Sequence, residues 1–92
     1  MTDLESLPGG DLVAKGLRDL ASGQESEESL LVSIGEPRLR QAGLALTKTL
    51  DSPEERLWAL LGRDDPDAAH SRYNALIRLL ISFERALECG VR

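Results

Sequence analysis

The segment from residue 66 to residue 88 constrains the fold most, because its apolar residues recur at helical spacing over about six turns. At about 100° per residue they cover an arc of roughly 200°, about twice the stripe of an ordinary surface helix. They are Ala69, Tyr73, Leu76, Ile77, Leu79, Leu80, Phe83, Ala86 and Leu87. Such a helix, about 35 Å long at 1.5 Å per residue, needs neighbours on two sides. The sequence therefore predicts an all-α protein with one long C-terminal helix.

Caps and glycine stops predict shorter helices before this one. Asp11 is placed to cap a helix that stops at Gly23, and Ser26, followed by two glutamates, is placed to cap a second that stops at Gly35. A third short helix is expected over residues 37–42. The segment 44–50 has no clear helical period and is expected to be a loop.

The strongest local signal is Ser52-Pro53-Glu54-Glu55, which has the pattern of a capping box with proline at the first helical position. The packing face of the helix that follows is expected to consist of Leu57, Trp58, Leu60 and Leu61, before Gly62. Together these signals predict a compact bundle of four to five helices.

A chain of 92 residues is expected to form one domain with a thin core, which favours oligomerisation. Residues 1–10 end in Pro8-Gly9-Gly10 and are expected to be a flexible segment, unless Leu4 and Leu7 find a hydrophobic dock. Residues 11–92 are expected to be a single helical domain.

Composition argues against several functional classes. Sixteen acidic residues against 11 Lys plus Arg give a net charge of −5, without a basic run, which disfavours binding to nucleic acid. No apolar stretch is long enough to span a bilayer, and residues 1–10 lack the order of a signal peptide. The single cysteine, Cys89, suits a reducing compartment, so we expect a cytoplasmic protein.

Self-association through the long helix is the favoured interpretation. Five of its apolar residues repeat at intervals of three and four, which suits a helix pair crossing at a shallow angle. Arg72 falls inside the apolar arc and is expected to meet a carboxylate from another helix or subunit. The expected interface therefore comprises Arg72, Tyr73, Leu76, Leu80, Phe83 and Leu87. The alternative is a monomer in which this helix is a central post wrapped by the others.

Chemistry-bearing side chains gather at the start of the long helix, where Arg63, His70 and Asn74 form an alternative polar site. Adjacent residues on a helix point about 100° apart, so His70 and Ser71 do not form the facing pair that activates a nucleophile. One histidine and one cysteine do not supply a zinc site, and the calcium-hand pattern is absent. We therefore expect neither a metal, nor a cofactor, nor an enzyme.

Two patterns give a nucleic-acid alternative. The spacing of Arg63 and His70, with a polar residue after the arginine, resembles the Arg-(four to six residues)-His motif of the HEPN ribonuclease family. This resemblance covers eight residues and implies a small, often dimeric helical ribonuclease with His70 as base and Arg63 as phosphate contact. Separately, residues 26–42 could form a helix-turn-helix with Arg38 and Arg40 facing the DNA groove. The preferred reading remains a small cytoplasmic protein-protein interaction module.

Overall fold

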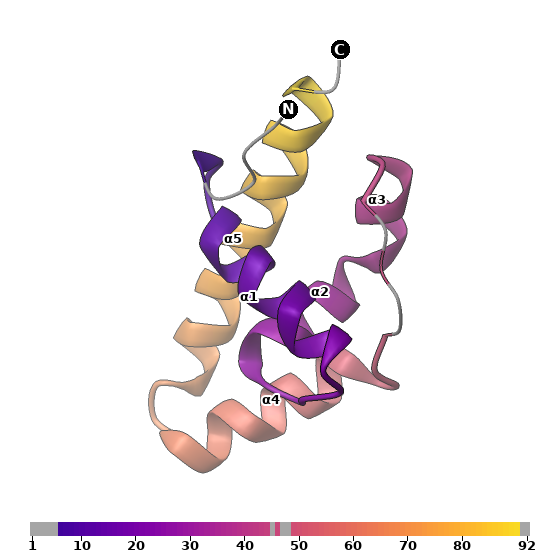
Figure 1. Ribbon diagram of the computed structural model, residues 1–92. Helices are drawn as coiled ribbons and strands as arrows, with labels where there is room; N and C mark the ends of the chain where they lie inside the picture. The colour runs from indigo at the N-terminus through magenta and orange to yellow at the C-terminus, as the bar shows by residue number, and fades with distance from the viewer. Residues whose placement is uncertain (1–5, 45, 47–48, 91–92) are drawn as a thin grey trace.

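The computed structural model describes residues 6–44, 46 and 49–90 and confirms the all-α class. Within these residues there is no strand, and the helices follow one another as drawn in Figure 1. They are α1 (Gly10–Ala21), α2 (Glu27–Ile34), α3 (Glu36–Gln41), α4 (Pro53–Asp64) and α5 (Ala69–Gly90).

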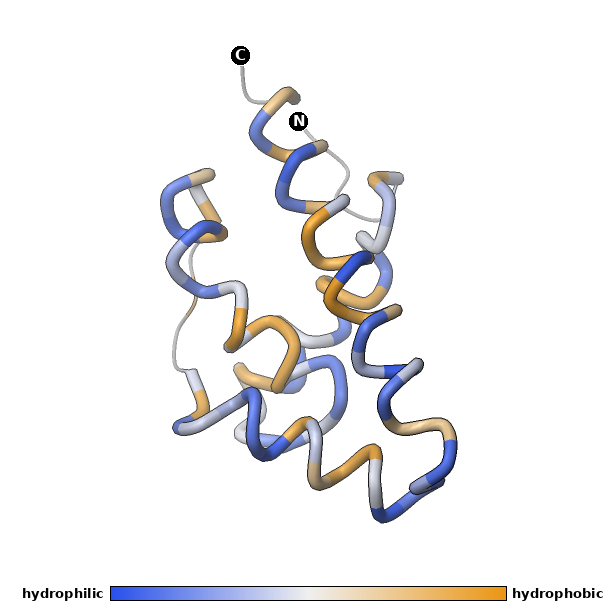
Figure 2. The backbone as a smooth tube through the Cα atoms, turned by 180° about the vertical axis from the view of Figure 1, so that it is seen from behind, coloured by the Kyte–Doolittle hydropathy of each residue, from blue (hydrophilic) through white to orange (hydrophobic). Residues whose placement is uncertain are grey.

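The long helix α5 lies along one edge of the molecule and not at its centre (Figure 1). Its 22 residues correspond to about 33 Å, and the whole molecule measures 40 × 25 × 18 Å. Helices α4 and α5 meet at a corner, and α1 and α2 lie in the angle between them (Figures 1 and 2). In the part of the chain that the structure describes, no ring of helices surrounds α5, so its position differs from the central-post arrangement, while the choice between monomer and dimer stays a prediction.

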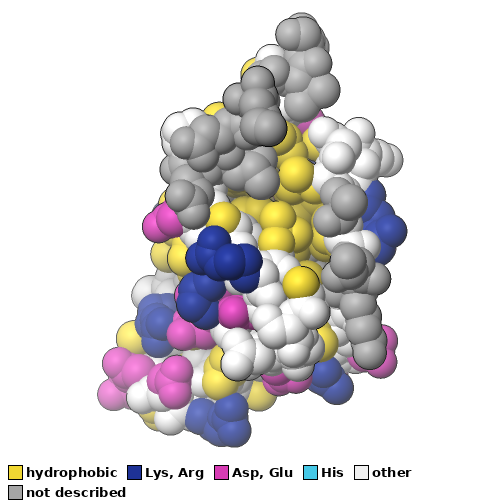
Figure 3. All heavy atoms as spheres, in the orientation of Figure 1, with side chains coloured by type: hydrophobic (Ala, Val, Ile, Leu, Met, Phe, Trp, Pro, Cys, Tyr) yellow, Lys and Arg dark blue, Asp and Glu magenta, His cyan; other side chains and the backbone are white. Residues whose placement is uncertain are grey.

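The short helix α2 occupies the centre instead. Its residues from Ser29 to Ser33 are all buried, as expected of a helix that is covered on every side. Against it pack Val13 and Leu20 of α1 and Leu57 and Leu61 of α4, all buried. Hydrophobic side chains also fill the space between α1 and α3 that looks open in the ribbon view (Figure 3). The core therefore forms around a helix of only eight residues.

A glycine allows α1 to approach α2 closely. A Cβ atom at Gly16 would lie 2.5 Å from the backbone oxygen of Glu28 and 2.5 Å from Cγ2 of Val32. Ordinary contacts of a Cβ atom begin at 3.4 Å. A side chain of any size at position 16 would therefore push the two helices apart.

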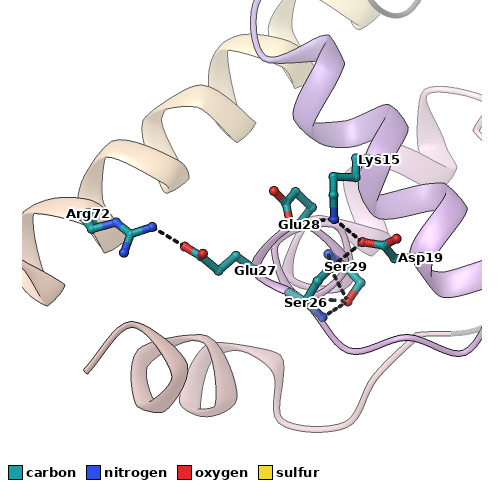
Figure 4. A network of polar contacts seen from close by, with 7 residues as sticks. All are labelled: Lys15, Asp19, Ser26, Glu27, Glu28, Ser29 and Arg72. Carbon is teal, nitrogen blue, oxygen red and sulfur yellow. Dashed lines mark hydrogen bonds and ion pairs between the residues drawn. The ribbon is translucent and has the colours of Figure 1, made fainter. Parts of the chain in front are cut away.

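Polar groups join the same two helices at one end (Figure 4). Lys15 donates from Nζ to Asp19 at 2.7 Å and to Glu28 at 3.3 Å, while the Ser26 hydroxyl donates to Asp19 at 2.6 Å. Ser26 also accepts from the backbone N–H of Ser29 at 3.1 Å, as its predicted capping role requires. The hydrogen bonds from Lys15 and Ser26 lower the pKa of Asp19, which keeps this carboxylate charged.

Three predicted helix starts differ from the structure. Helix α1 begins at Gly10 after Gly9 in the left-handed conformation (φ 72°), so Asp11 lies in the first turn and is not the cap. Ser52 also has a positive φ, of 47°, and makes no capping hydrogen bond, because side-chain caps need an extended backbone there. Helix α5 begins at Ala69, three residues later than Pro66.

The segment before α1 is partly docked. Leu7 packs against the core, and Gly9 lies so close to α5 that a Cβ atom there would be 2.9 Å from the backbone oxygen of Leu79. Leu4, the other residue that could dock, lies outside the described residues. Residues 6–10 therefore extend the helical domain beyond its predicted boundary at residue 11.

Candidate interaction surface

A tight turn sets the angle between α4 and α5. Helix α4 continues through Gly62 to Asp64, so this glycine does not end the helix as predicted. Asp65 then accepts hydrogen bonds at its side-chain oxygen from the backbone N–H groups of Asp67 (3.2 Å) and Ala68 (3.3 Å). This Asx-type turn brings the first turns of α5 back beside the middle of α4.

Three rings meet inside this corner. Trp58 of α4 contacts His70 and Tyr73 of α5 edge-on, with ring centroids 5.9 Å and 5.5 Å apart. His70 in turn contacts Asn74, with 3.2 Å between Nε2 and Nδ2. Trp58 nevertheless remains 46% exposed. It was expected on the buried packing face of its helix, and this expectation is wrong because Leu57 and Leu61 supply that face.

The aromatic pair lines an open pocket of about 300 Å³ together with two glutamates. Trp58 and Tyr73 contribute its apolar walls, and Glu54 and Glu55, both exposed, come from the first turn of α4. Burial, reinforced by the charge of Glu54, raises the pKa of Tyr73 above its usual value of 10.0. The phenol is therefore neutral at physiological pH and close to the acidic wall.

Apolar side chains continue from this pocket along one flank of α5. Tyr73, Ile77 and Ile81 follow one another at intervals of four residues, which places them side by side on the helix surface. Tyr73 and Ile77 are half-buried, and Ile81 is 37% exposed. We call Trp58, Tyr73, Ile77 and Ile81 the flank strip. Figure 2, the view from behind, shows hydrophobic and hydrophilic residues alternating along the backbone of α5.

Charge is distributed unevenly around the flank strip. Glu54 and Glu55 lie at the end formed by Trp58 and Tyr73. Arg78 and Arg85 are one turn before and one turn after Ile81 and are exposed. Neither arginine forms an ion pair within the part of the chain that the structure describes. One end of the strip is therefore acidic and the other basic.

The interface expected from the sequence is mostly inside the chain. Leu80, Phe83 and Leu87 are 4%, 0% and 3% exposed, because they pack into the core of their own molecule. In this conformation these three side chains are covered by their own molecule, and their place in an interface stays a prediction. Leu76 is half-buried against the same core, and only Tyr73 also lies in the flank strip.

Arg72 meets a carboxylate from another helix, as its position in the apolar arc suggested. Its guanidinium lies 2.6 Å from Oε1 of Glu27 in the first turn of α2 (Figure 4). The side chain is 42% exposed, so this ion pair joins α5 to α2 at the surface and is not buried. It is an intramolecular contact and gives Arg72 a structural role.

The alternative polar site is only partly assembled. His70 and Asn74 are in contact, whereas Arg63 lies in the last turn of α4, exposed and on the other side of the Asp65 turn. No contact of Arg63 with His70 appears among the described residues. The side chains of the helix-turn-helix alternative are also occupied: Arg38 pairs with Glu88 at 3.4 Å, and Arg40 pairs with Glu36 at 3.2 Å.

A buried carboxylate lies where α5 passes the turn between α2 and α3. Glu84 is 4% exposed, and its Oε2 would be 3.1 Å from a Cβ atom at Gly35. Arg38 approaches it to 3.9 Å. Burial raises the pKa of Glu84, Arg38 opposes this rise, and Glu88 adds to it. The sequence reasoning did not single out Glu84, although it lies between apolar directions on the helical projection.

No protein-family model, curated protein or solved structure matches this chain. Within the described residues no helix has the length and apolar character needed to cross a membrane. The same residues hold no group of three or more His, Cys, Asp or Glu side chains able to bind a metal ion.

Proposed function

We propose that this protein is an interaction module that self-associates through the flank strip. The observation that carries the proposal is the strip itself, in which four large apolar side chains remain partly exposed in one row although the domain has already formed its core. Contiguous apolar surface of this kind marks binding sites, whereas single exposed apolar residues do not.

The charges favour a second copy in antiparallel orientation. A twofold axis near Ile77 would place Tyr73 of one copy opposite Ile81 of the other, because both are four residues from Ile77. Glu54 and Glu55 of one copy would then lie near Arg78 or Arg85 of the other. Parallel packing would place like charges together, which is unfavourable.

A short strip predicts a weak dimer. Interfaces smaller than about 1,200 Å² in total belong to transient complexes, and exposed ion pairs at the rim add only about 0.2–1 kcal/mol each. Sedimentation equilibrium is therefore expected to show a reversible monomer–dimer equilibrium in the micromolar range. A strict monomer throughout that range would refute the proposal.

Two substitutions on α5 make the test specific. Ile81→Glu places a charge in the flank strip and is expected to abolish the dimer. Leu79→Glu is the matched control, since Leu79 is similarly exposed (39%) but points about 160° away around the helix. Loss of the dimer in the control alone, or in neither variant, would contradict the assignment of the strip.

Charge reversal tests the orientation. Glu54→Arg or Arg85→Glu alone is expected to weaken the dimer up to about fivefold, and the two together are expected to restore it. If the double variant is weaker than either single variant, the two side chains are not opposed and the antiparallel arrangement is wrong.

A further inference from the structure

We infer that the pocket between α4 and α5 binds a small organic cation, such as an alkylammonium or guanidinium head group, between Trp58, Tyr73, Glu54 and Glu55. The pocket is complete within one chain, and a second copy bound through the flank strip would compete with the cation for it. Cation binding follows from the combination of aromatic walls and unpaired acids in one cavity.

The aromatic walls have the geometry that attracts a cation. The rings of Trp58 and Tyr73 are 5.5 Å apart between centroids and inclined at 75°, so they form two sides of a corner. Ring faces carry negative electrostatic potential, and a cation within about 6 Å of a ring centroid is attracted to it. With 46% of Trp58 exposed, this ring remains accessible to a ligand from solvent.

The remaining walls select for positive charge. Glu54 and Glu55 are exposed, and neither forms an ion pair among the described residues. The charge of Glu54 reaches the phenol of Tyr73, whose pKa it helps to raise. An anion would be repelled by both carboxylates, and a neutral apolar group would gain nothing from them. A cation gains from the rings and from the acids together.

The pocket is also small and held in shape. About 300 Å³ is at the lower limit of ligand pockets, which suits a head group better than a large metabolite. His70 contacts Trp58 edge-on, and Asn74 contacts His70, so the indole is supported by a second ring of α5 besides Tyr73. Little side-chain ordering is then left to oppose binding.

Fluorescence of Trp58, the only tryptophan of the chain, measures the binding directly. Choline and methylguanidinium are expected to give saturable changes in the millimolar range. The neutral isostere of choline, in which a tert-butyl group replaces trimethylammonium, is expected to give none. An equal response to choline and its isostere, or no saturation by either cation, would overturn the inference.

Substitutions assign the binding to this pocket. Glu54→Gln is expected to weaken choline binding about two- to fivefold. The matched control Asp11→Asn removes an exposed acid from the first turn of α1 and is expected to change nothing. Tyr73→Leu is expected to weaken binding, whereas Tyr73→Phe keeps the ring and the affinity. Equal losses in Glu54→Gln and Asp11→Asn would mean a general charge effect and no site.

Sedimentation with and without choline distinguishes two possible occupants of the pocket, a free cation and an arginine of a second copy. If choline dissociates a wild-type dimer and Arg85→Gln is monomeric yet binds choline, the natural occupant is the arginine of the second copy. If choline binds and leaves the association state unchanged, the occupant is a separate cation. A wild-type protein that is monomeric and still binds choline refutes self-association alone, whereas a wild-type dimer whose monomeric Ile81→Glu variant shows no response to either cation refutes this pocket alone.

Discussion

Replacing Gly16 by alanine tests the closest contact in the fold. The new Cβ atom would be 2.5 Å from the backbone oxygen of Glu28 and from Cγ2 of Val32, nearly 1 Å short of an ordinary contact at 3.4 Å. The oxygen belongs to the backbone of the central helix and does not rotate away, so α1 must retreat. Retreat would loosen the packing of Val13 and Leu20 on α2.

The expected cost follows from two opposing terms. Overpacking of this kind costs about 1–3 kcal/mol, and alanine regains about 1 kcal/mol over glycine inside a helix. Because one of the obstructing atoms is the backbone oxygen of Glu28, we expect an overpacking cost in the upper part of its range. The free energy of unfolding is then expected to fall by about 2 kcal/mol in total. For a domain of this size that loss lowers the Tm by roughly 10 °C.

Gly62 provides the matched control, because it also lies inside a helix but a Cβ atom there would meet nothing within 4 Å. Gly62→Ala is therefore expected to stabilise the protein by about 0.5–1 kcal/mol. Urea unfolding at one fixed protein concentration, followed by circular dichroism and tryptophan fluorescence, gives both differences if the m values are unchanged. A Gly16→Ala protein as stable as Gly62→Ala would refute the close approach of α1 and α2.

Three further predictions concern charged and titrating groups. Burial raises the pKa of Glu84, so its favourable contribution is present below its unfolded pKa near 4.5 and is lost as the pH rises through the raised value. Glu84→Gln is therefore expected to stabilise the protein at pH 7, because the amide carries no charge to bury, and to show no gain in urea unfolding at about pH 4. Tyr73, the only tyrosine, is expected to ionise above its usual value of 10.0 in an ultraviolet titration, and Glu54→Gln should lower that midpoint; an unchanged midpoint would show that the two groups do not interact. Arg72→Met removes a half-exposed ion pair with Glu27 and is expected to cost at most about 1 kcal/mol, and a loss of several kcal/mol in thermal melts would contradict the exposed geometry.

The candidate surface was only partly predictable from the sequence. The sequence placed Tyr73 in the expected interface and predicted that Arg72 would meet an acid. Both predictions were possible because they depend only on the directions of side chains around one helix. Trp58 was expected on the buried face of its helix. The sequence alone does not show that Leu57 and Leu61 are enough to cover α2, which leaves Trp58 exposed. Ile81 falls just outside the apolar arc of the helix, and that position at its edge was the only signal of an exposed apolar side chain.

Leu80, Phe83 and Leu87, three residues of the expected interface, show how much periodicity can predict. An apolar arc of roughly 200° predicts how much of the helix surface is shielded from water. It does not predict which part of that surface is buried by the same chain. Here the middle of the arc faces the core of its own molecule, and Leu79 at one edge of the arc and Ile81 just beyond the other edge remain exposed. Only the packing of α4 and α2 against α5 distinguishes the middle from the flanks.

The sequence by itself determined the elements of this protein. Helical spacing, the Ser26 cap and the stop at Gly23 depend on interactions within one or two turns, so they could be predicted without neighbours. Tertiary structure decided which helix is central, which apolar residues remain exposed, and that Glu54 and Glu55 share a pocket with two rings. These properties arise from contacts between helices whose relative positions are set by the Asp65 turn and by the close approach at Gly16, and no local pattern of residues specifies them.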